Sequence, residues 1–155
     1  MAGFGVPVRA TFKLGESVNH QVTTPIAAFV LRVSLGILFL AHAGLKIFVF
    51  TLPGTAEFFQ SIGLPGFMAY LIALLEVVGG VALIVGFYAS WFALPLALDL
   101  LGAIVTVHGK NGWLFTNKGG GWEYLVLWIV ALVVQFLIGD GAWSVKPSQW
   151  KPSRA

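Results

Sequence analysis

Residues 72–86 read IALLEVVGGVALIVG, an apolar stretch in which Glu76 is the one charged residue. The apolar run extends over residues 67–87, which matches the length of about 20 residues that a helix needs to cross a bilayer core of about 30 Å. A charge at the bilayer centre costs about 2.5–3.5 kcal/mol on insertion scales, so Glu76 must face the interior of a bundle and find partners there. The stretch therefore predicts a membrane-spanning helix with a polar inner face.

The composition of the whole chain also favours membrane insertion. Of its 155 residues, 58% are hydrophobic and only 10% are charged, whereas a soluble domain carries about 25% charged residues. The net charge of +3 is small and the basic residues form no cluster on an aromatic-rich face, so nucleic acid is not an expected partner. The chain has no cysteine, which excludes disulfides, thiolate metal sites and thiol chemistry carried by the chain itself.

Three further apolar runs accompany the first, at residues 26–50, 90–108 and 122–138. In lipid only helices and closed barrels satisfy their backbone groups, and these unbroken runs are too long for alternating barrel strands. We therefore predict four helices. The hairpin at residues 88–90 is tight, so the second and third helices must be antiparallel neighbours.

The prediction is thus an all-α integral membrane protein with a four-helix transmembrane bundle at residues 26–138. A polar N-terminal segment at 1–25 and a C-terminal tail at 139–155 flank it. The first loop contains AEFFQSIG between two Pro-Gly turns, which predicts a short amphipathic helix at the membrane interface. Residues 1–25 have no apolar core of signal-peptide length, so we expect no cleavable signal.

Basic residues predict the orientation of the bundle in the membrane. The two terminal segments carry Arg9, Lys13, Lys146, Lys151 and Arg154, and the loops on the opposite side carry Lys110 and Lys118. An even number of helices places both termini on one side, and the excess of positive charge predicts that this side is cytoplasmic.

Ionisable residues recur within the predicted helices. They are Arg32, His42 and Lys46 in the first, Glu76 in the second, Asp99 and His108 in the third, and Glu123 at the start of the fourth. At 3.6 residues per turn, Glu76 shares one side of its helix with small residues such as Ala73 and Gly80. Small residues allow helices to approach closely in lipid, so these stripes indicate mutually facing surfaces of one bundle.

Depth along the helices predicts where these groups meet. With a rise of about 1.5 Å per residue, Glu76 and Asp99 fall near the middle of their helices, whereas Arg32 lies nearer the cytoplasmic end. We predict that His42, Lys46, Glu76, His108 and Glu123 converge on one polar cavity open to the outer side. Two carboxylates at the midplane cannot both stay ionised without cations nearby, so they pair with Arg32, Lys46 or a ligand, or one carries a proton.

Three of these residues also have a purely structural interpretation, whereas Glu76 and Asp99 are harder to explain in that way. Arg32 would simply extend to the cytoplasmic interface, Glu123 would complement a helix dipole, and His108 would bind a loop carbonyl. Histidines and carboxylates could together bind iron, copper or zinc, but no HxxH or ExxH pair places two ligands on one helix face. We therefore predict no metal site.

Several motifs, in this order and spacing, resemble a known family. They are LRVSLGILFLAHAGLK at 31–46, SIGLPG at 61–66, LLEVVGGVALIVGF at 74–87, His108, GGGWEY at 119–124 and IGDGAWSV at 138–145. Together they resemble the DoxX family of small four-helix bacterial membrane proteins, relatives of the DoxD subunit of thiosulfate:quinone oxidoreductase. The chain departs from the family pattern at Gly44, Ser90, Asp140 and Lys146.

The resemblance implies a bacterial inner-membrane protein linked to quinone-coupled oxidation or to redox stress, working with protein partner subunits. The candidate catalytic residues are then Glu76, His42 and Lys46, and the candidates for binding a cofactor such as quinone are His108, Glu123, Asp99, Arg32 and Trp122. The chain has no visible electron carrier, so we expect at most one subunit of an oxidoreductase. Two alternatives stay open, namely a non-catalytic accessory or assembly subunit and a small unit for proton or solute permeation.

Overall fold

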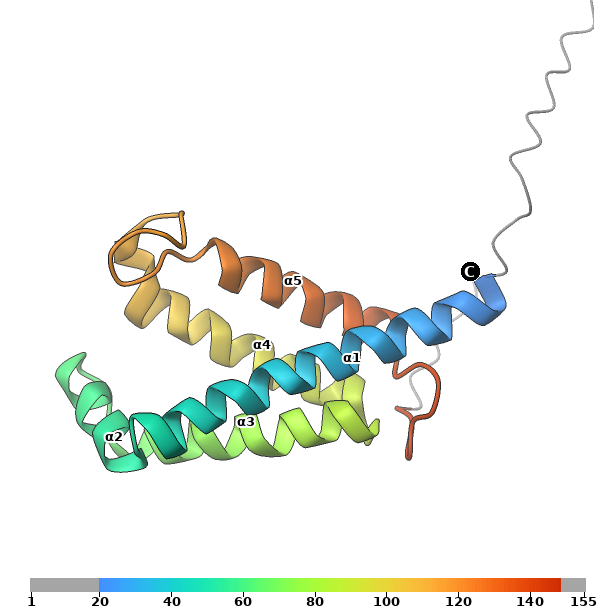
Figure 1. Cartoon of the computed structure of the whole chain (residues 1–155), viewed down its shortest axis with the longest axis horizontal. Coiled ribbons are helices and arrows are strands. Elements are labelled where there is room, and N and C mark those ends of the chain that lie inside the picture. Colours follow the sequence, from blue (N-terminus) through green and yellow to red (C-terminus); the bar gives the residue numbers. More distant parts are fainter. Residues whose placement is uncertain (1–19, 149–155) are drawn as a thin grey trace, which may run out of the picture.

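The computed structural model describes residues 20–148, and the elements it defines are helical throughout (Figure 1). The α-helices are α1 (His20–Gly44), α2 (Leu52–Ser61), α3 (Phe67–Val85), α4 (Ala89–Ala103) and α5 (Glu123–Ile138). Short π-helical turns continue α1 over Leu45–Val49 and α4 over Ile104–His108, and a 3-10 turn follows at Gly109–Asn111. An isolated backbone bridge joins Phe87 to Lys146.

The predicted all-α membrane bundle is confirmed. Three stretches are long and apolar enough to cross a membrane, namely Val22–Val49, Phe67–Val85 and Ala89–Asn111, and α5 is a shorter apolar helix. The short helix predicted in the first loop is α2, which begins at Leu52, before the predicted segment. Thr51 caps its start, because the Thr51 side chain accepts a hydrogen bond from the Gly54 N–H at 3.2 Å.

The bundle consists of two helix pairs. Helix α1 packs along α3, α4 packs along α5, and the tight hairpin brings α3 against α4. In Figure 1 the two pairs are close together at the end where α1 begins and α5 ends, and they diverge toward α2 and the loop at 109–122. We call the first end the base and the second end the mouth. The divergence of the pairs positions the site described below.

Small residues bring α1 and α3 into close contact, as the stripe of small residues predicted. A Cβ atom added at Gly36 would lie 2.6 Å from the carbonyl oxygen of Gly80, so only glycine allows this approach. Gly79 faces α4 instead, where an added Cβ would lie 2.9 Å from Leu96. Phe39 and Leu83 are fully buried in the core beside this crossing.

The base is closed by Arg32, which is fully buried. Its guanidinium donates hydrogen bonds to carbonyl oxygens only: Leu83 and Ile84 at 2.8 and 2.6 Å, and Asp140, Ala142 and Trp143 at 2.8, 2.9 and 3.2 Å. The side chain therefore does not extend to a membrane surface, which corrects the structural interpretation of Arg32, and of the cations considered for the midplane carboxylates Arg32 is not the one that pairs with Glu76. It cross-links the last turn of α3 to the segment after α5.

That segment belonged to the predicted C-terminal tail, but its described part, up to Ser148, folds back against the bundle. The Asp140 carboxylate accepts hydrogen bonds from the hydroxyl of Ser90, from the backbone N–H of Ser90 at 2.7 Å and from the Ser148 N–H at 2.5 Å. Ser90 lies in the first turn of α4, where free N–H groups favour an anion. Asp140 therefore caps α4 from 50 residues away.

The described residues fix which segments share an end, although the termini themselves lie outside them. We propose that the base is cytoplasmic, as the basic residues predict. The chain has no cysteine, so a single introduced cysteine reports one position. We expect Val145→Cys, at an exposed site of the base, to react with an impermeant maleimide only after cells are permeabilised, and Phe115→Cys at the mouth to react in intact cells. Labelling of Val145→Cys from outside would reverse the orientation.

Candidate functional site

A cavity of about 920 Å³ lies at the mouth, where the two helix pairs diverge. All five α-helices contribute to its wall, together with both π-helical turns. Its polar side chains include His42, Lys46, Glu76, Asp99 and His108. Four of the five residues that the sequence placed in one polar cavity, namely His42, Lys46, Glu76 and His108, line it.

An ion pair lies in the wall of the cavity. The Lys46 ammonium donates to both carboxylate oxygens of Glu76, at 2.8 and 2.9 Å. The Glu76 side chain is 4% exposed and that of Lys46 is 20% exposed, so the pair is largely withdrawn from solvent. Because the carboxylate is buried, loss of Lys46 would strand it at a cost of about 3–5 kcal/mol.

The π-helical turns present two of the polar residues. Lys46 lies in the turn that ends α1, and His108 is the last residue of the turn that ends α4. A π-turn holds one more residue than an α-turn, which shifts the side chains after it to another face of the helix, and such turns are frequent at functional sites. One turn belongs to each helix pair, so both pairs direct an ionisable group at the mouth.

In both histidines of the cavity, Nδ1 lies at hydrogen-bond distance from a backbone carbonyl oxygen. Nδ1 of His42 lies 3.0 Å from the carbonyl oxygen of Leu38, and Nδ1 of His108 lies 2.9 Å from that of Gly120. A carbonyl oxygen only accepts hydrogen bonds, so Nδ1 carries the proton in both rings. The structural interpretation of His108, a hydrogen bond to a loop carbonyl, is thus correct, and it leaves Nε2 available.

Asp99 is the second carboxylate of the cavity wall. Within residues 20–148 its side chain makes no hydrogen bond and no ion pair, although it is close enough to interact electrostatically with Glu76 and Lys46. The sequence left open whether the two midplane carboxylates pair with Arg32, Lys46 or a ligand, and in the structure Lys46 is the cation beside them. Among the described residues no group of three or more His, Asp or Glu side chains is arranged to hold a metal ion.

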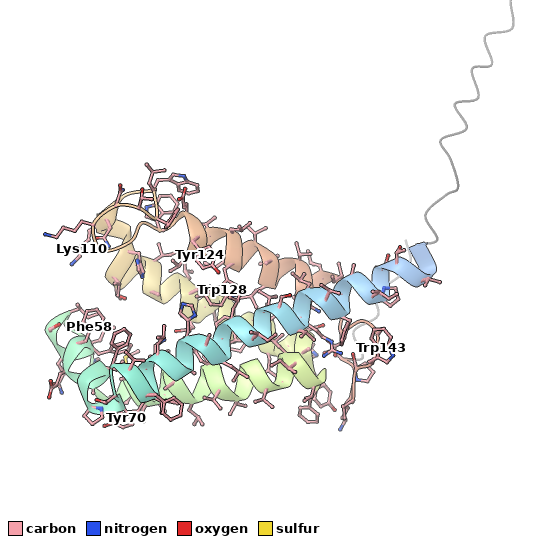
Figure 2. All side chains as sticks on the ribbon, viewed as in Figure 1. Phe58, Tyr70, Lys110, Tyr124, Trp128 and Trp143 are labelled. Carbon is pink, nitrogen blue, oxygen red and sulfur yellow. The ribbon has the colours of Figure 1, made fainter. Side chains whose placement is uncertain are left out.

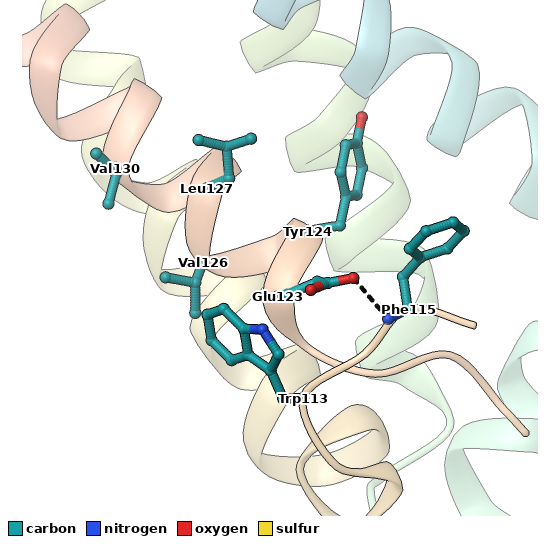
Figure 3. Close-up of a pocket in the computed structure, with 7 residues that line it drawn as sticks. All are labelled: Trp113, Phe115, Glu123, Tyr124, Val126, Leu127 and Val130. Carbon is teal, nitrogen blue, oxygen red and sulfur yellow. Dashed lines mark hydrogen bonds between the residues drawn. The ribbon is translucent and has the colours of Figure 1, made fainter. Parts of the chain in front are cut away.

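Glu123 and Trp122 lie outside the cavity, which corrects the prediction that Glu123 joins the polar cluster. Glu123 accepts a hydrogen bond from the Phe115 N–H at 2.9 Å and borders a separate surface pocket of about 520 Å³ (Figure 3). Trp122 packs edge-on against Trp113, with ring centroids 4.6 Å apart. Both residues hold the glycine-rich loop onto the start of α5. Arg32, at the base, is likewise not part of the cavity wall.

Aromatic residues of the cavity were not singled out from the sequence. Tyr124 and Trp128 of α5 face the other helix pair, and Phe58 of α2 lies across from them (Figure 2). The Trp128 ring packs against the His42 ring at 4.9 Å between centroids. Their spacing of one helical turn was a usable signal, because Tyr124 and Trp128 necessarily share a face of α5.

The comparisons with known proteins agree with this architecture. The model of the family described as DoxX matches residues 27–109, which is more than half of the chain. The chain belongs to the DoxX family. The matched region of this DoxX protein runs from α1 to the end of the π-turn after α4, and it includes five polar residues of the cavity, His42, Lys46, Glu76, Asp99 and His108.

Two curated relatives of this DoxX protein cover most of its length. "Putative oxidoreductase CatD" of Bacillus subtilis (strain 168) is 42% identical over 102 residues, which are 66% of this chain and 72% of that protein. "Inner membrane protein YqjF" of Escherichia coli (strain K12) is 36% identical over 129 residues, 77% of this chain and 89% of that protein. No solved structure matches the chain significantly.

Proposed function

We propose that this DoxX protein binds the ring of a lipid-soluble quinone in the cavity at the mouth and serves as the quinone-interacting subunit of a bacterial inner-membrane oxidoreductase. The observation that carries the proposal is the Lys46–Glu76 ion pair in the wall of a largely apolar cavity formed by membrane-spanning helices. Buried charges at such depth are functional candidates by default.

The residues present fit a quinone. Binding pockets for small organic molecules typically measure about 300–1,000 Å³ and combine apolar walls with a few polar groups, and this cavity of about 920 Å³ has both. Trp128, Tyr124 and Phe58 offer aromatic surface to a ring, while the ionisable groups offer hydrogen bonds to its oxygens. A quinone supplies two-electron chemistry with an equal uptake of protons when it is bound.

The side chains of this chain would bind the ligand and hold protons. His42 and His108 each have a free ring nitrogen, and Glu76 and Asp99 line the same cavity, so protons of the ligand have several acceptors within it. The chain contains no cysteine, so thiol redox chemistry must come from elsewhere, and electrons must come from a partner subunit. The printed name of the relative CatD, a putative oxidoreductase, supports the same class of function.

The bundle is tightly packed between the cavity and the base, which favours binding over permeation. This region is filled by buried side chains such as Leu35, Leu83, Leu132 and Arg32. A solute path through the protein would have to pass this packed core. A non-catalytic accessory subunit would need the ion pair only for stability, so substitutions of Glu76 distinguish it from the proposal.

We expect Glu76→Gln to yield a folded, membrane-inserted protein in which the quinone-linked activity of the partner complex falls about 10²-fold or more, because the amide keeps the shape but holds no proton. Glu76→Ala should instead lower the free energy of unfolding by about 3–5 kcal/mol, because Lys46 loses its partner. Quinone reduction by membranes complemented with each variant measures the first effect, and thermal unfolding in detergent measures the second.

Glu57→Gln is the matched control, because Glu57 is an exposed glutamate on α2 and does not line the cavity. We expect it to change neither activity nor stability. Full activity of Glu76→Gln would instead make the carboxylate structural and favour the accessory-subunit alternative.

A further inference from the structure

Among the polar atoms of the cavity that have no hydrogen-bond partner, acceptors outnumber donors. The histidine rings show this first. Nδ1–H of each ring is used by a backbone carbonyl, Leu38 for His42 and Gly120 for His108. In a neutral imidazole the other nitrogen then carries a lone pair, so each ring offers Nε2 to the cavity as an acceptor.

The carboxylates add further acceptors. Asp99 makes no hydrogen bond within the described residues, and a carboxyl group offers lone pairs on both of its oxygens, together with one O–H when it is protonated. Glu76 receives two hydrogen bonds from one ammonium group and so retains acceptor capacity. These two residues and the two histidines come from α1, α3, α4 and the π-turn after α4, so acceptors surround the cavity.

Donors are fewer: the Tyr124 hydroxyl and one N–H of Lys46 have no hydrogen-bond partner among the described residues, and most other donors are already used. Two of the three N–H groups of Lys46 donate hydrogen bonds to Glu76. The hydroxyls of Thr55 and Thr106 donate to the carbonyl oxygens of Thr51 and Gly102, at 2.9 and 2.8 Å. The Trp128 indole N–H has no partner among the described residues, but its nitrogen is buried and so is not exposed to solvent in the cavity.

We infer that the cavity is built for a ligand that donates hydrogen bonds, namely a lipid-soluble aromatic diol, the reduced form of a quinone, in preference to the quinone itself. The inference rests on the proposed function and adds the form of the ligand that is held. The two phenolic hydroxyls of a diol can donate hydrogen bonds to Asp99 and to a histidine Nε2. The two carbonyl oxygens of a quinone only accept hydrogen bonds, so they would face other acceptors without a donor between them. An acceptor left without a donor in a buried site loses binding, about tenfold or more for each missing hydrogen bond to a charged group.

Three probes of one shape test the inference. They are a decyl-substituted benzohydroquinone, the corresponding benzoquinone, and the dimethyl ether of the hydroquinone, which keeps the ring and tail but has no donor. Binding is measured anaerobically to the full chain in lipid nanodiscs, with dithionite present for the reduced probe. We expect the diol to bind at least about tenfold more tightly than the quinone, and the ether to bind no more tightly than the quinone.

The outcomes separate this inference from the proposed function. Binding of the quinone as tightly as the diol, or more tightly, overturns the inference and leaves quinone binding standing. Binding of none of the three probes overturns both. A diol preference that the dimethyl ether shares also overturns the inference, because shape alone would then explain it.

Asp99→Asn tests the proposed acceptor directly, because the amide has nearly the same shape and adds N–H donors. We expect the diol preference to shrink at least about fivefold in this variant, and to stay unchanged in the surface control Glu57→Gln. An unchanged preference in Asp99→Asn removes Asp99 from the inference.

A measurement on the unsubstituted protein covers the case in which Asp99→Asn does not fold. Nitrogen NMR of the histidine rings should show Nδ1 protonated and Nε2 bare for His42 and His108, with the Nε2 signal of at least one ring moving on addition of the diol and not of the ether. Nε2-protonated rings would contradict the assignment of these nitrogens as acceptors and would overturn the inference.

Discussion

Gly36→Ala is expected to destabilise the bundle severely, by about 3 kcal/mol or more, because overpacking of a fixed crossing typically costs about 1–3 kcal/mol and here the obstacle is backbone. The added Cβ would lie 2.6 Å from the carbonyl oxygen of Gly80 and 2.7 Å from Cγ1 of Ile84. The Gly80 carbonyl belongs to the hydrogen-bonded interior of α3, so it cannot rotate away as a side chain would. The helices must separate, and the contact between α1 and α3 weakens along its length.

Gly44→Ala on the same helix is the matched control, because a Cβ added at Gly44 meets nothing within 4 Å. Alanine is about 1 kcal/mol more favourable than glycine in a helix, so this variant should be neutral or slightly more stable. Thermal unfolding in detergent, followed by fluorescence size-exclusion chromatography, compares the two. Equal stability of the two variants would contradict the close crossing of α1 and α3.

Arg32→Met is expected to have the second large effect. The variant keeps an apolar stem of similar length but removes the donors of five hydrogen bonds to carbonyl oxygens. A hydrogen bond to a charged group contributes about 1.5–3 kcal/mol, and neighbouring contributions are not additive, so we expect a loss of about 3–5 kcal/mol in total. For a chain of this size such a loss lowers the midpoint of thermal unfolding by about 10 °C.

Two further variants interpret that result. Arg32→Lys retains the charge but lacks the planar set of donors, so it should restore only part of the stability. Lys146→Met, at an exposed position of the base, removes a charge that contacts the Phe87 and Tyr88 rings and should cost less than about 1 kcal/mol. If Arg32→Met unfolded within about 2 °C of the unsubstituted protein, the cross-link at the base would contribute little to stability.

The helices and the contacts between α1 and α3 were predictable from the sequence because their physical causes are local. Runs of about 20 apolar residues are typical of membrane-spanning helices, and the small residues around Gly80 indicated the helix face that another helix approaches. Glu76 was predictable for the same reason, because a carboxylate in an apolar helix needs a cation and Lys46 lay at a compatible depth. The structure agrees with this pairing.

The interpretation of Arg32 failed because its partners are backbone atoms that no sequence pattern displays. They come from residues 51 to 111 positions away, and a carbonyl oxygen is present at every residue. Asp140 was missed for a similar reason, since its role depends on where α4 begins in space. Glu123 was placed in the cavity by depth alone, whereas its hydrogen bond to the Phe115 N–H depends on the path of a glycine-rich loop.

Local helix geometry accounts for the remaining difference. At 3.6 residues per turn Lys46 would share one helix face with Gly36 and Phe39, but α1 ends at Gly44 and continues as a π-turn. The same change occurs between Ala103 and His108 at the end of α4. Sequence periodicity does not reveal an inserted residue in a helix whose neighbours are uniformly apolar, so the direction of these side chains required the structure.

The brevity of α5 has a consequence for the surrounding lipid. Its 16 residues span about 24 Å, whereas a typical hydrocarbon core is about 30 Å thick and α1 with its π-turn is long enough to exceed it. Helix α5 is therefore too short for a typical bilayer, whereas α1 can match it by tilting. The bilayer beside α5 has to become thinner. The protein has a lower energy where the membrane is already thin, or where a neighbouring protein with an equally short flank covers α5.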